Sequence, residues 1–287
     1  MTEAATAVAG YLRRIGLGPD LPPTLGTLTA IHRHHLAAVP YENLEIMLGR
    51  PPSTDPRACL ERVVEVGRAG YCFHQNGALE VVLRELGFAV QRRHGQVLTD
   101  DATPRGSLNH LVLVVSGLPT PENPGGRWWP DAGLGDAFVD PLPLVEGEHV
   151  QDGFRYRLED VSDDGWLFRH DPTGTFTDLH VTDAPVGEAE VLAAHRHLAT
   201  PPDGRFTQVL AVLRRDSGGV DVLRGCVRSR VEPGGTVARD ELTSYDAWRA
   251  GLVELRVGLA DVAEEELRDL FERSLAVHRA WVAEGRP

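Results

Sequence analysis

The sequence predicts an α+β fold in three consecutive parts, because the spacing of its apolar residues changes twice along the 287-residue chain. Over residues 1–90, apolar side chains recur three and four positions apart, which is typical of amphipathic helices. Over residues 91–197, β-branched runs and alternating segments between turns predict an antiparallel sheet or small barrel. Residues 198–287 combine a hairpin pattern with a last amphipathic helix, so we expect an α/β unit there.

Helices are expected in the first part at three places. The segments GTLTAIHRHHLAAV (26–39) and PRACLERVVEVGR (56–68) have the mixed spacing, and each ends near proline or glycine. The third helix begins at Cys72, and its apolar residues fall at i, i+3, i+4 and i+7 (Leu79, Val82, Leu83 and Leu86). Gly87 follows and is expected to end this helix.

Strands are expected in the middle and last parts. HLVLVVSGL (110–118) is a short run rich in β-branched residues, and FRYRLED (154–160) and GWLFRHD (165–171) alternate on either side of a turn. The segment 206–231 predicts one long hairpin that turns at DSGG (216–219).

The last helix has both a predicted start and a predicted buried face. Asp261 is expected to cap it, with Glu264 completing a capping box. One face of the helix carries the residues that are expected to be buried (Leu267, Leu270, Phe271, Ser274 and His278).

The composition excludes several classes of function. The formal charge is −13, and all 29 basic residues are arginine without a dense cluster, which argues against binding to a nucleic-acid backbone. A single anionic cofactor could still be held by backbone amides and one or two arginines. No apolar stretch reaches the length of a membrane helix, and the N-terminus lacks the apolar core of a secretory signal. The three cysteines (Cys59, Cys72 and Cys226) are far apart and odd in number, which disfavours disulfides and favours a reducing cytoplasm.

Cys72 is the cysteine whose setting suggests reactivity. It stands at an expected helix start, where unpaired N–H groups and the helix dipole favour thiolate over thiol. His110 opens a predicted strand and Asp131 precedes a glycine-rich turn, so the order Cys, His, Asp could supply a nucleophile, a base and an orienting carboxylate. Cys59 and Cys226 are expected to be buried packing residues.

Metal binding is not expected. His195 and His197 are two positions apart and share no helix face, and Cys72 with His74 makes only half of a ligand set. We therefore expect no zinc.

Four segments in order resemble the arylamine N-acetyltransferase family. VPYENLEI (39–46) resembles its Val-Pro-Phe-Glu-Asn-Leu stretch, and RAGYCFHQN (68–76) resembles its Arg-Gly-Gly-Tyr/Trp-Cys-x-Glu-x-Asn active-site segment. HLVLVV from His110 and DAGLG (131–135) are similar to its histidine strand and its Asp-Val/Ala-Gly-Phe-Gly turn. The resemblance implies a cysteine-protease-like core: a helical domain (1–90), a β-barrel domain (91–197) and a C-terminal α/β lid (198–287).

The resemblance also implies roles for individual residues. Cys72 would accept the acetyl group of acetyl-coenzyme A, His110 would be its proton partner and Asp131 would orient the imidazole. An arylamine, hydrazine or N-hydroxyarylamine would then take the acetyl group in a ping-pong cycle. Four further implied roles are cofactor binding by Gly133 and Gly135, and lining of the substrate pocket by Phe73 and Leu134. Glu42 and Arg68 would form an ion pair that braces the active-site loop.

Several residues depart from the family pattern near the site. Ala69 replaces a glycine, His74 replaces a glutamate, Pro130 precedes the aspartate, and Leu134 stands where the turn usually has phenylalanine. Because pocket shape sets specificity, these changes leave open an amide synthase that releases or cyclises a polyketide bound to an acyl carrier protein. The order Cys, His, Asp is also compatible with a hydrolase. A non-catalytic binding protein is a fourth alternative, which an intact set of these three residues disfavours.

Overall fold

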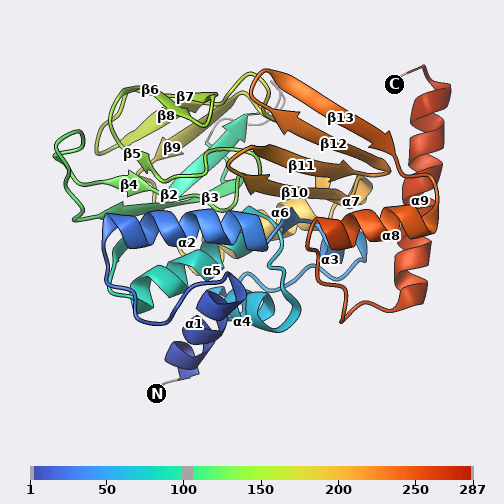
Figure 1. The fold of residues 1–287 in the computed structure, drawn as a ribbon, viewed down its shortest axis with the longest axis horizontal. Helices are drawn as coiled ribbons and strands as arrows, with labels where there is room; N and C mark the ends of the chain where they lie inside the picture. The colour runs from blue at the N-terminus through green and yellow to red at the C-terminus, as the bar shows by residue number, and fades with distance from the viewer. Residues whose placement is uncertain (1–2, 99–105, 286–287) are drawn as a thin grey trace.

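The computed structural model describes residues 3–98 and 106–285, in which helices pack against two antiparallel sheets (Figure 1). The helices that precede the strands of the larger sheet in the sequence are α1 (Glu3–Arg14), α2 (Leu25–Ala38), α3 (Leu44–Met47), α4 (Pro56–Val66) and α5 (Cys72–Glu85). The α+β class with a helical N-terminal region is therefore confirmed.

Local signals at the ends of these helices match the structure. Thr24 caps α2 by accepting the N–H of Thr27, and Asp55 caps α4 by accepting the N–H of Ala58 (2.9 Å). Gly87 follows α5 with a φ of +88°, a left-handed conformation that glycine adopts without strain. The predicted end of α5 at Gly87 is therefore confirmed.

The larger sheet is barrel-like and carries much of the site. Its strands are β2 (Ala89–Leu98), β3 (His110–Ser116), β4 (Trp128–Trp129), β5 (Leu142–Pro143), β6 (Gly147–Gln151), β7 (Phe154–Glu159), β8 (Gly165–Arg169) and β9 (Asp178–Thr182). Their spatial order is β5-β4-β3-β2-β9-β8-β7-β6. The first half of β2 pairs with β3 and its second half with β9, so the long strand joins the two halves of the sheet. The interior is filled by aromatic rings in edge-to-face contact, among them Trp129, Phe138 and Phe168.

The smaller sheet takes strands from both ends of the sequence. Its order is β1 (Tyr41–Glu42), β10 (Ala211–Asp216), β11 (Gly219–Arg224), β12 (Val227–Glu232) and β13 (Gly235–Glu241). The turn predicted at 216–219 is confirmed, but the single long hairpin is wrong. The chain turns again at Gly225, whose φ is +58° and whose N–H donates to Leu210 O, so Val227 begins a third strand. β1, from the helical N-terminal region, also belongs to this sheet. The division of the chain into three domains at residues 90 and 197 stays a prediction.

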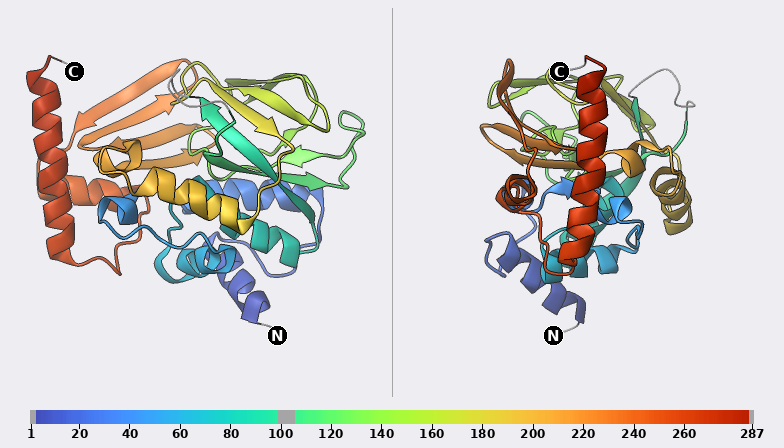
Figure 2. Two further views of the ribbon diagram at one scale, coloured as in Figure 1. Left: turned by 180° about the vertical axis from the view of Figure 1, so that it is seen from behind. Right: turned by 90° about the vertical axis from the view of Figure 1, so that its right-hand side faces the viewer.

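The remaining helices are α6 (Glu188–Ala199), α7 (Arg205–Gln208), α8 (Tyr245–Glu254) and α9 (Glu264–Ala283). The helix α9 stands across the end of the smaller sheet (Figure 1 and Figure 2). All five residues predicted for its inner face are buried. Its predicted cap is wrong: the N-cap is Ala263, whose N–H is accepted by Glu266 (3.0 Å), while the carboxylate of Asp261 binds Arg68.

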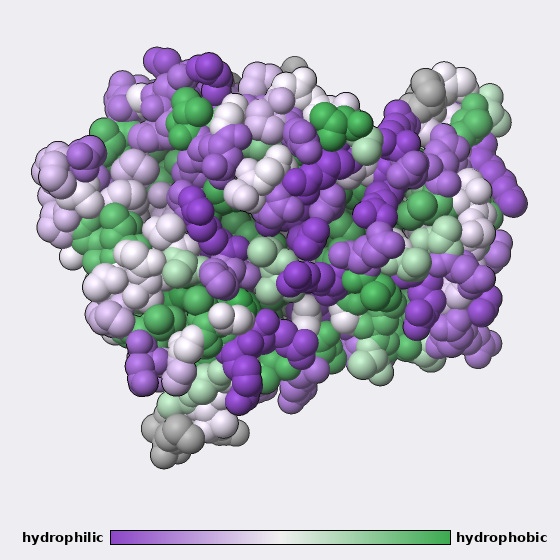
Figure 3. Space-filling model, in the orientation of Figure 1, coloured by the Kyte–Doolittle hydropathy of each residue, from purple (hydrophilic) through white to green (hydrophobic). Residues whose placement is uncertain are grey.

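The face seen in Figure 3 is largely hydrophilic, with apolar side chains in separate small groups. Large exposed apolar residues, such as Val237 and Val253, are scattered on the described part of the chain. Within residues 3–98 and 106–285, no helix combines the length and the apolar character that crossing a membrane requires.

Candidate active site

Cys72 is the first residue of α5 and is 4% exposed. Its Sγ lies 3.6 Å from Asn109 O, next to the start of β3. The turn at Gly133 lies against it so closely that a Cβ at position 133 would be 2.7 Å from the Cα of Cys72. Glycine is required there because the turn after Asp131 must touch the start of α5.

His110 and Asp131 form a buried pair beside the thiol. The Nε2 of His110 is 2.8 Å from Asp131 Oδ2, and both side chains are almost fully buried. Burial alone would lower the pKa of His110, but the charge and hydrogen bond of Asp131, with smaller contributions from Cys72, raise it to about 10. The imidazole is therefore charged at neutral pH and can hold a neighbouring thiolate.

The carboxylate of Asp131 is held by four donors. Oδ2 accepts from His110 and from Trp129 Nε1 (2.9 Å), whereas Oδ1 accepts from Asn76 Nδ2 (2.8 Å) and the N–H of Gly133 (2.9 Å). Asn76 also donates to Leu111 O and accepts the N–H of Ala132, which ties α5 to β3 and to the turn. A carboxylate with this many partners has one orientation.

Sequence reasoning missed Asn76, Trp129 and His32 as residues of this site. Asn76 lies in the segment that resembles the family's active-site motif, but only the fold brings its amide between β3 and the aspartate turn. His32 accepts the N–H of Asp131 from helix α2, across a sequence separation of 99 residues. No local pattern marks such a contact.

His74, the residue in place of the family glutamate, lies in a buried cluster beside the thiol. Its ring packs against Tyr71 and His195 with centroids 5.2 and 5.1 Å away, and Tyr71 Oη is 2.8 Å from His195 Nδ1. Burial, and next the proximity of His195, lower the pKa of His74 to about 3, so its ring is neutral. Within the residues that the structure describes, no group of three His, Cys, Asp or Glu could hold a metal ion.

Arg68 is braced by acidic partners other than the one that the resemblance implied. Its guanidinium is 2.5 Å from Glu45, 2.6 Å from Asp261 and within hydrogen-bond distance of Gly258 O. Glu42 makes no direct ion pair with it; Oε2 of Glu42 accepts the N–H of Leu44 (2.6 Å) instead. Burial raises the pKa of the Glu42 carboxyl, against the opposing charge of Arg68. The expected pair is thus corrected, because the short turn after Glu42 directs its carboxylate to its own backbone.

Replacing Arg68 with methionine is expected to lower the free energy of unfolding by about 3–5 kcal/mol, because it removes a fully buried partner of the buried Glu45 carboxylate. Arg50→Met is the matched control. Arg50 binds the same Glu45 at 2.7 Å, but its side chain is 41% exposed against 0% for Arg68. We expect a loss of less than about 1 kcal/mol for this control, measured by urea unfolding. An equal loss of unfolding free energy in both variants would show that the burial of Arg68 does not determine how much its ion pairs stabilise the fold.

The other residues that the sequence singled out are buried around the site. Phe73 is fully buried in the cluster that holds Tyr71 and Cys72, while Leu134 packs with the aromatic core of the larger sheet. Gly135 has a φ of +82°, and a Cβ there would be 3.3 Å from the ring of Tyr41.

Cys59 and Cys226 lie in separate apolar clusters, as expected for packing residues. Burial raises the pKa of Cys59 to about 12 and that of Cys226 to about 11, so both are neutral thiols.

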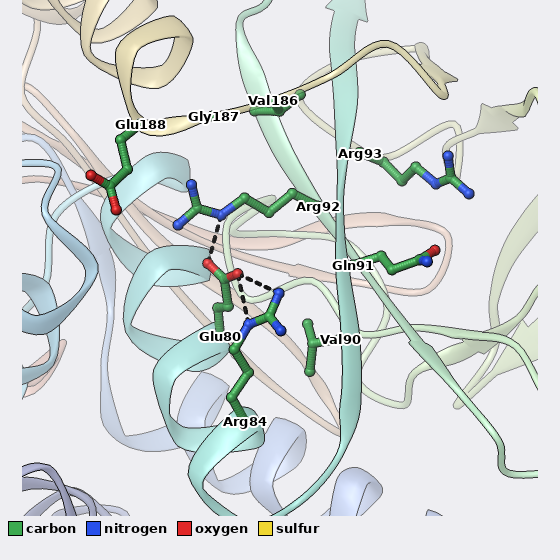
Figure 4. A pocket seen from close by; sticks show the side chains of 9 residues that line it. All are labelled: Glu80, Arg84, Val90, Gln91, Arg92, Arg93, Val186, Gly187 and Glu188. Atoms are coloured by element: carbon green, nitrogen blue, oxygen red, sulfur yellow. Dashed lines mark hydrogen bonds and ion pairs between the residues drawn. The ribbon is translucent and has the colours of Figure 1, made fainter.

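A groove of about 760 Å³ lies apart from these residues, between α5, β2 and the start of α6 (Figure 4). Among its lining residues, the carboxylate of Glu80 accepts hydrogen bonds from the Nε of Arg84 (3.0 Å) and of Arg92 (2.7 Å). Its lining does not include Cys72, His110 or Asp131. The thiol of Cys72 therefore lies outside this groove.

A cysteine at a helix start beside a buried histidine–aspartate pair is an arrangement that is also found in enzymes with a thiol nucleophile. The fold and the site together have this form. Within that class, the family model described as N-acetyltransferase matches residues 24–256, and the chain belongs to the arylamine N-acetyltransferase family. It is therefore an acyltransferase by family.

The relatives support this assignment by sequence and by fold. The arylamine N-acetyltransferase of Mycolicibacterium smegmatis is 35% identical over 215 residues, which cover 72% of this chain and 76% of that protein. The Mycobacterium marinum arylamine N-acetyltransferase, solved in complex with CoA, matches with a TM-score of 0.82 at 26% identity, covering 94% of this chain and 99% of that one. Proansamycin X synthase of Amycolatopsis mediterranei is 28% identical over 155 residues, which cover 53% of this chain and 57% of that protein.

Proposed function

We propose that the protein transfers an acetyl group from acetyl-coenzyme A to an arylamine, hydrazine or N-hydroxyarylamine through a thioester on Cys72. The observation that carries this proposal is the position of Cys72 at the start of α5, beside the buried pair of His110 and Asp131. Support for the donor comes from the Mycobacterium marinum relative, which was solved in complex with CoA.

In the first half of the cycle, the Cys72 thiolate attacks the thioester carbonyl and coenzyme A leaves with the proton of the His110 imidazolium. In the second half, the amine attacks the acetylated cysteine, the neutral His110 accepts the proton of the amine, and Cys72 leaves as thiolate. Asp131 holds the imidazole in one orientation and stabilises its charged form throughout both halves.

The surroundings of the thiol suit transfer rather than hydrolysis. Cys72 is 4% exposed, so few water molecules can reach a thioester there, and an amine is a better nucleophile toward it than water. In this proposal, Gly133 and Gly135 let the backbone approach the cofactor, and Phe73 and Leu134 line the acceptor side.

The test is intact mass spectrometry of the protein mixed with acetyl-coenzyme A and no acceptor. We expect a mass increase of one acetyl group that is located on Cys72 and is lost when an arylamine is added. Cys59→Ala and Cys226→Ala are the matched controls and should load to the same extent. An unmodified wild-type protein, or acetylation at another residue, would contradict the proposal.

An amide synthase is the second candidate, favoured by the match to proansamycin X synthase and by Leu134 in place of an aromatic residue. It would use the same cysteine but a bulky acyl group delivered by a carrier protein. Repeating the mass experiment with a long-chain acyl pantetheine thioester distinguishes the two functions. An amide synthase should load this thioester on Cys72 faster than it loads acetyl-coenzyme A.

A further inference from the structure

We propose that His32 is a positioning residue for this reaction: its neutral imidazole fixes the backbone of the Asp131 turn and thereby the orientation of His110. The inference rests on the proposed function, since it concerns the reactivity of Cys72. His32 belongs to α2, far from the reacting atoms in sequence, and contacts neither Cys72 nor His110 by any hydrogen bond that the structure describes.

The hydrogen bonds of His32 define its tautomer. The N–H of Asp131 donates to Nε2 over 3.0 Å, and Nδ1 lies 2.8 Å from Val139 O. A backbone N–H can only donate and a carbonyl can only accept, so the ring proton must be on Nδ1 and Nε2 must be bare. One imidazole thus holds both ends of the segment 131–139.

The ring is fully buried and stacks on Phe138, with centroids 5.8 Å apart and planes at 18°. Burial lowers the pKa of His32, whereas its hydrogen bond to Val139 O and the charges of Asp131 and Asp140 oppose that shift without cancelling it. The ring therefore stays neutral, as the acceptor role of Nε2 requires.

This contact matters because the Asp131 carboxylate can accept its several hydrogen bonds only while the backbone at Asp131 keeps one position. Trp129, Asn76 and Gly133 hold its oxygens, but His32 is the described side chain that holds its N–H. Without that bond the turn can shift relative to β3, and a displacement of about 1 Å near a reacting group can cost about a hundredfold in rate.

His34, two residues along the same helix, is a natural control. Its Nδ1 also lies 2.8 Å from a backbone carbonyl, that of Ile15, but it has no hydrogen bond to the Asp131 turn among those that the structure describes. His32 and His34 therefore share the carbonyl bond, but His32 is buried whereas His34 is exposed, and His32 alone of the two accepts the N–H of Asp131 among the hydrogen bonds described.

The experiment compares His32→Gln, His32→Asn and His34→Asn. The amide oxygen of glutamine can occupy the place of Nε2 and accept the N–H of Asp131, whereas asparagine can replace only the Nδ1 donor. We expect His32→Asn to lower kcat and the alkylation rate of Cys72 by iodoacetamide about a hundredfold, with the KM for acetyl-coenzyme A little changed. His32→Gln should stay within about tenfold of wild type on the same scale, and His34→Asn should match wild type.

A second readout needs no substrate. The proton between His110 Nε2 and Asp131 should give a downfield NMR signal that is retained in His32→Gln and shifted or lost in His32→Asn. Equal behaviour of the asparagine and glutamine variants, or a loss of thermal stability with kcat and the proton signal unchanged, would overturn the proposal. If wild type is not acetylated at all, the proposed function fails, but alkylation and the NMR signal still test the role of His32.

Discussion

Cys72→Ala is expected to abolish acetyl transfer while the fold persists. Removing the nucleophile of a comparable triad costs about 10⁶ in kcat, and Cys72 is the cysteine that has a charged imidazole beside it. The change removes one sulfur atom and breaks none of the hydrogen bonds that hold Asp131, so circular dichroism and the unfolding midpoint should change little. The measurement is multiple turnover with acetyl-coenzyme A and an arylamine.

The controls are the two other thiols. Cys59→Ala and Cys226→Ala should keep their turnover, although each leaves a small cavity in a packed apolar cluster and should lower stability. Continued turnover by Cys72→Ala at more than a trace would exclude a covalent intermediate on this residue.

Asp131→Asn is expected to lower transfer by about 10⁴, the cost of the same change in a serine triad. The surroundings leave the amide one orientation. Its oxygen faces Asn76 Nδ2 and the N–H of Gly133, because neither can accept a hydrogen bond, so its NH₂ group faces Trp129 and His110, of which only His110 can become an acceptor by changing tautomer. His110 can then accept that NH₂ group only with Nε2 bare, which is the wrong tautomer for a base toward Cys72.

The same variant should change the pH dependence of Cys72 alkylation. In wild type the imidazolium persists below about pH 10, because Asp131 outweighs the burial of His110 and raises its pKa to about 10. In Asp131→Asn burial remains without that charge, so the imidazole is neutral near pH 7 and the thiolate loses its counter-ion. Iodoacetamide alkylation at neutral pH should therefore slow, and it should recover only as the pH rises.

Asp136→Asn is the matched control for this prediction. Asp136 is a second buried aspartate in the same turn, but its carboxylate lies 3.4 Å from His170 and accepts the N–H of Thr175. We expect this variant to keep transfer close to wild type once folded. If Asp131→Asn lost only a few-fold, or if Asp136→Asn lost more, then Asp131 would not be the residue that orients His110.

Several predictions that rest on neighbouring residues are confirmed by the structure. The start of α5 at Cys72, its end at Gly87, and the strand that begins at His110 all follow from patterns within one element. Turn glycines and apolar spacing act over a few residues, so these features can be predicted without the fold.

Predictions of partners fail when the partner comes from elsewhere in the chain. The sequence pattern predicts Asp261 as the cap of α9, yet its carboxylate binds Arg68, which is 193 residues away in the sequence. The resemblance pairs Arg68 with Glu42, but Glu45 and Asp261 are the acidic groups that its guanidinium reaches. An ionised side chain takes the partners that burial brings within reach, and sequence spacing does not reveal them.

The sequence by itself therefore determined the α+β class, the family and the identities of a cysteine, a histidine and an aspartate suited to one site. Only the tertiary structure decided how Asp131 is held, because its partners come from α2, α5, β4 and its own turn. The physical reason is that each element acquires its local form from nearby residues. The geometry of a buried polar cluster depends instead on how separate elements pack, because that packing decides which donors face the same carboxylate.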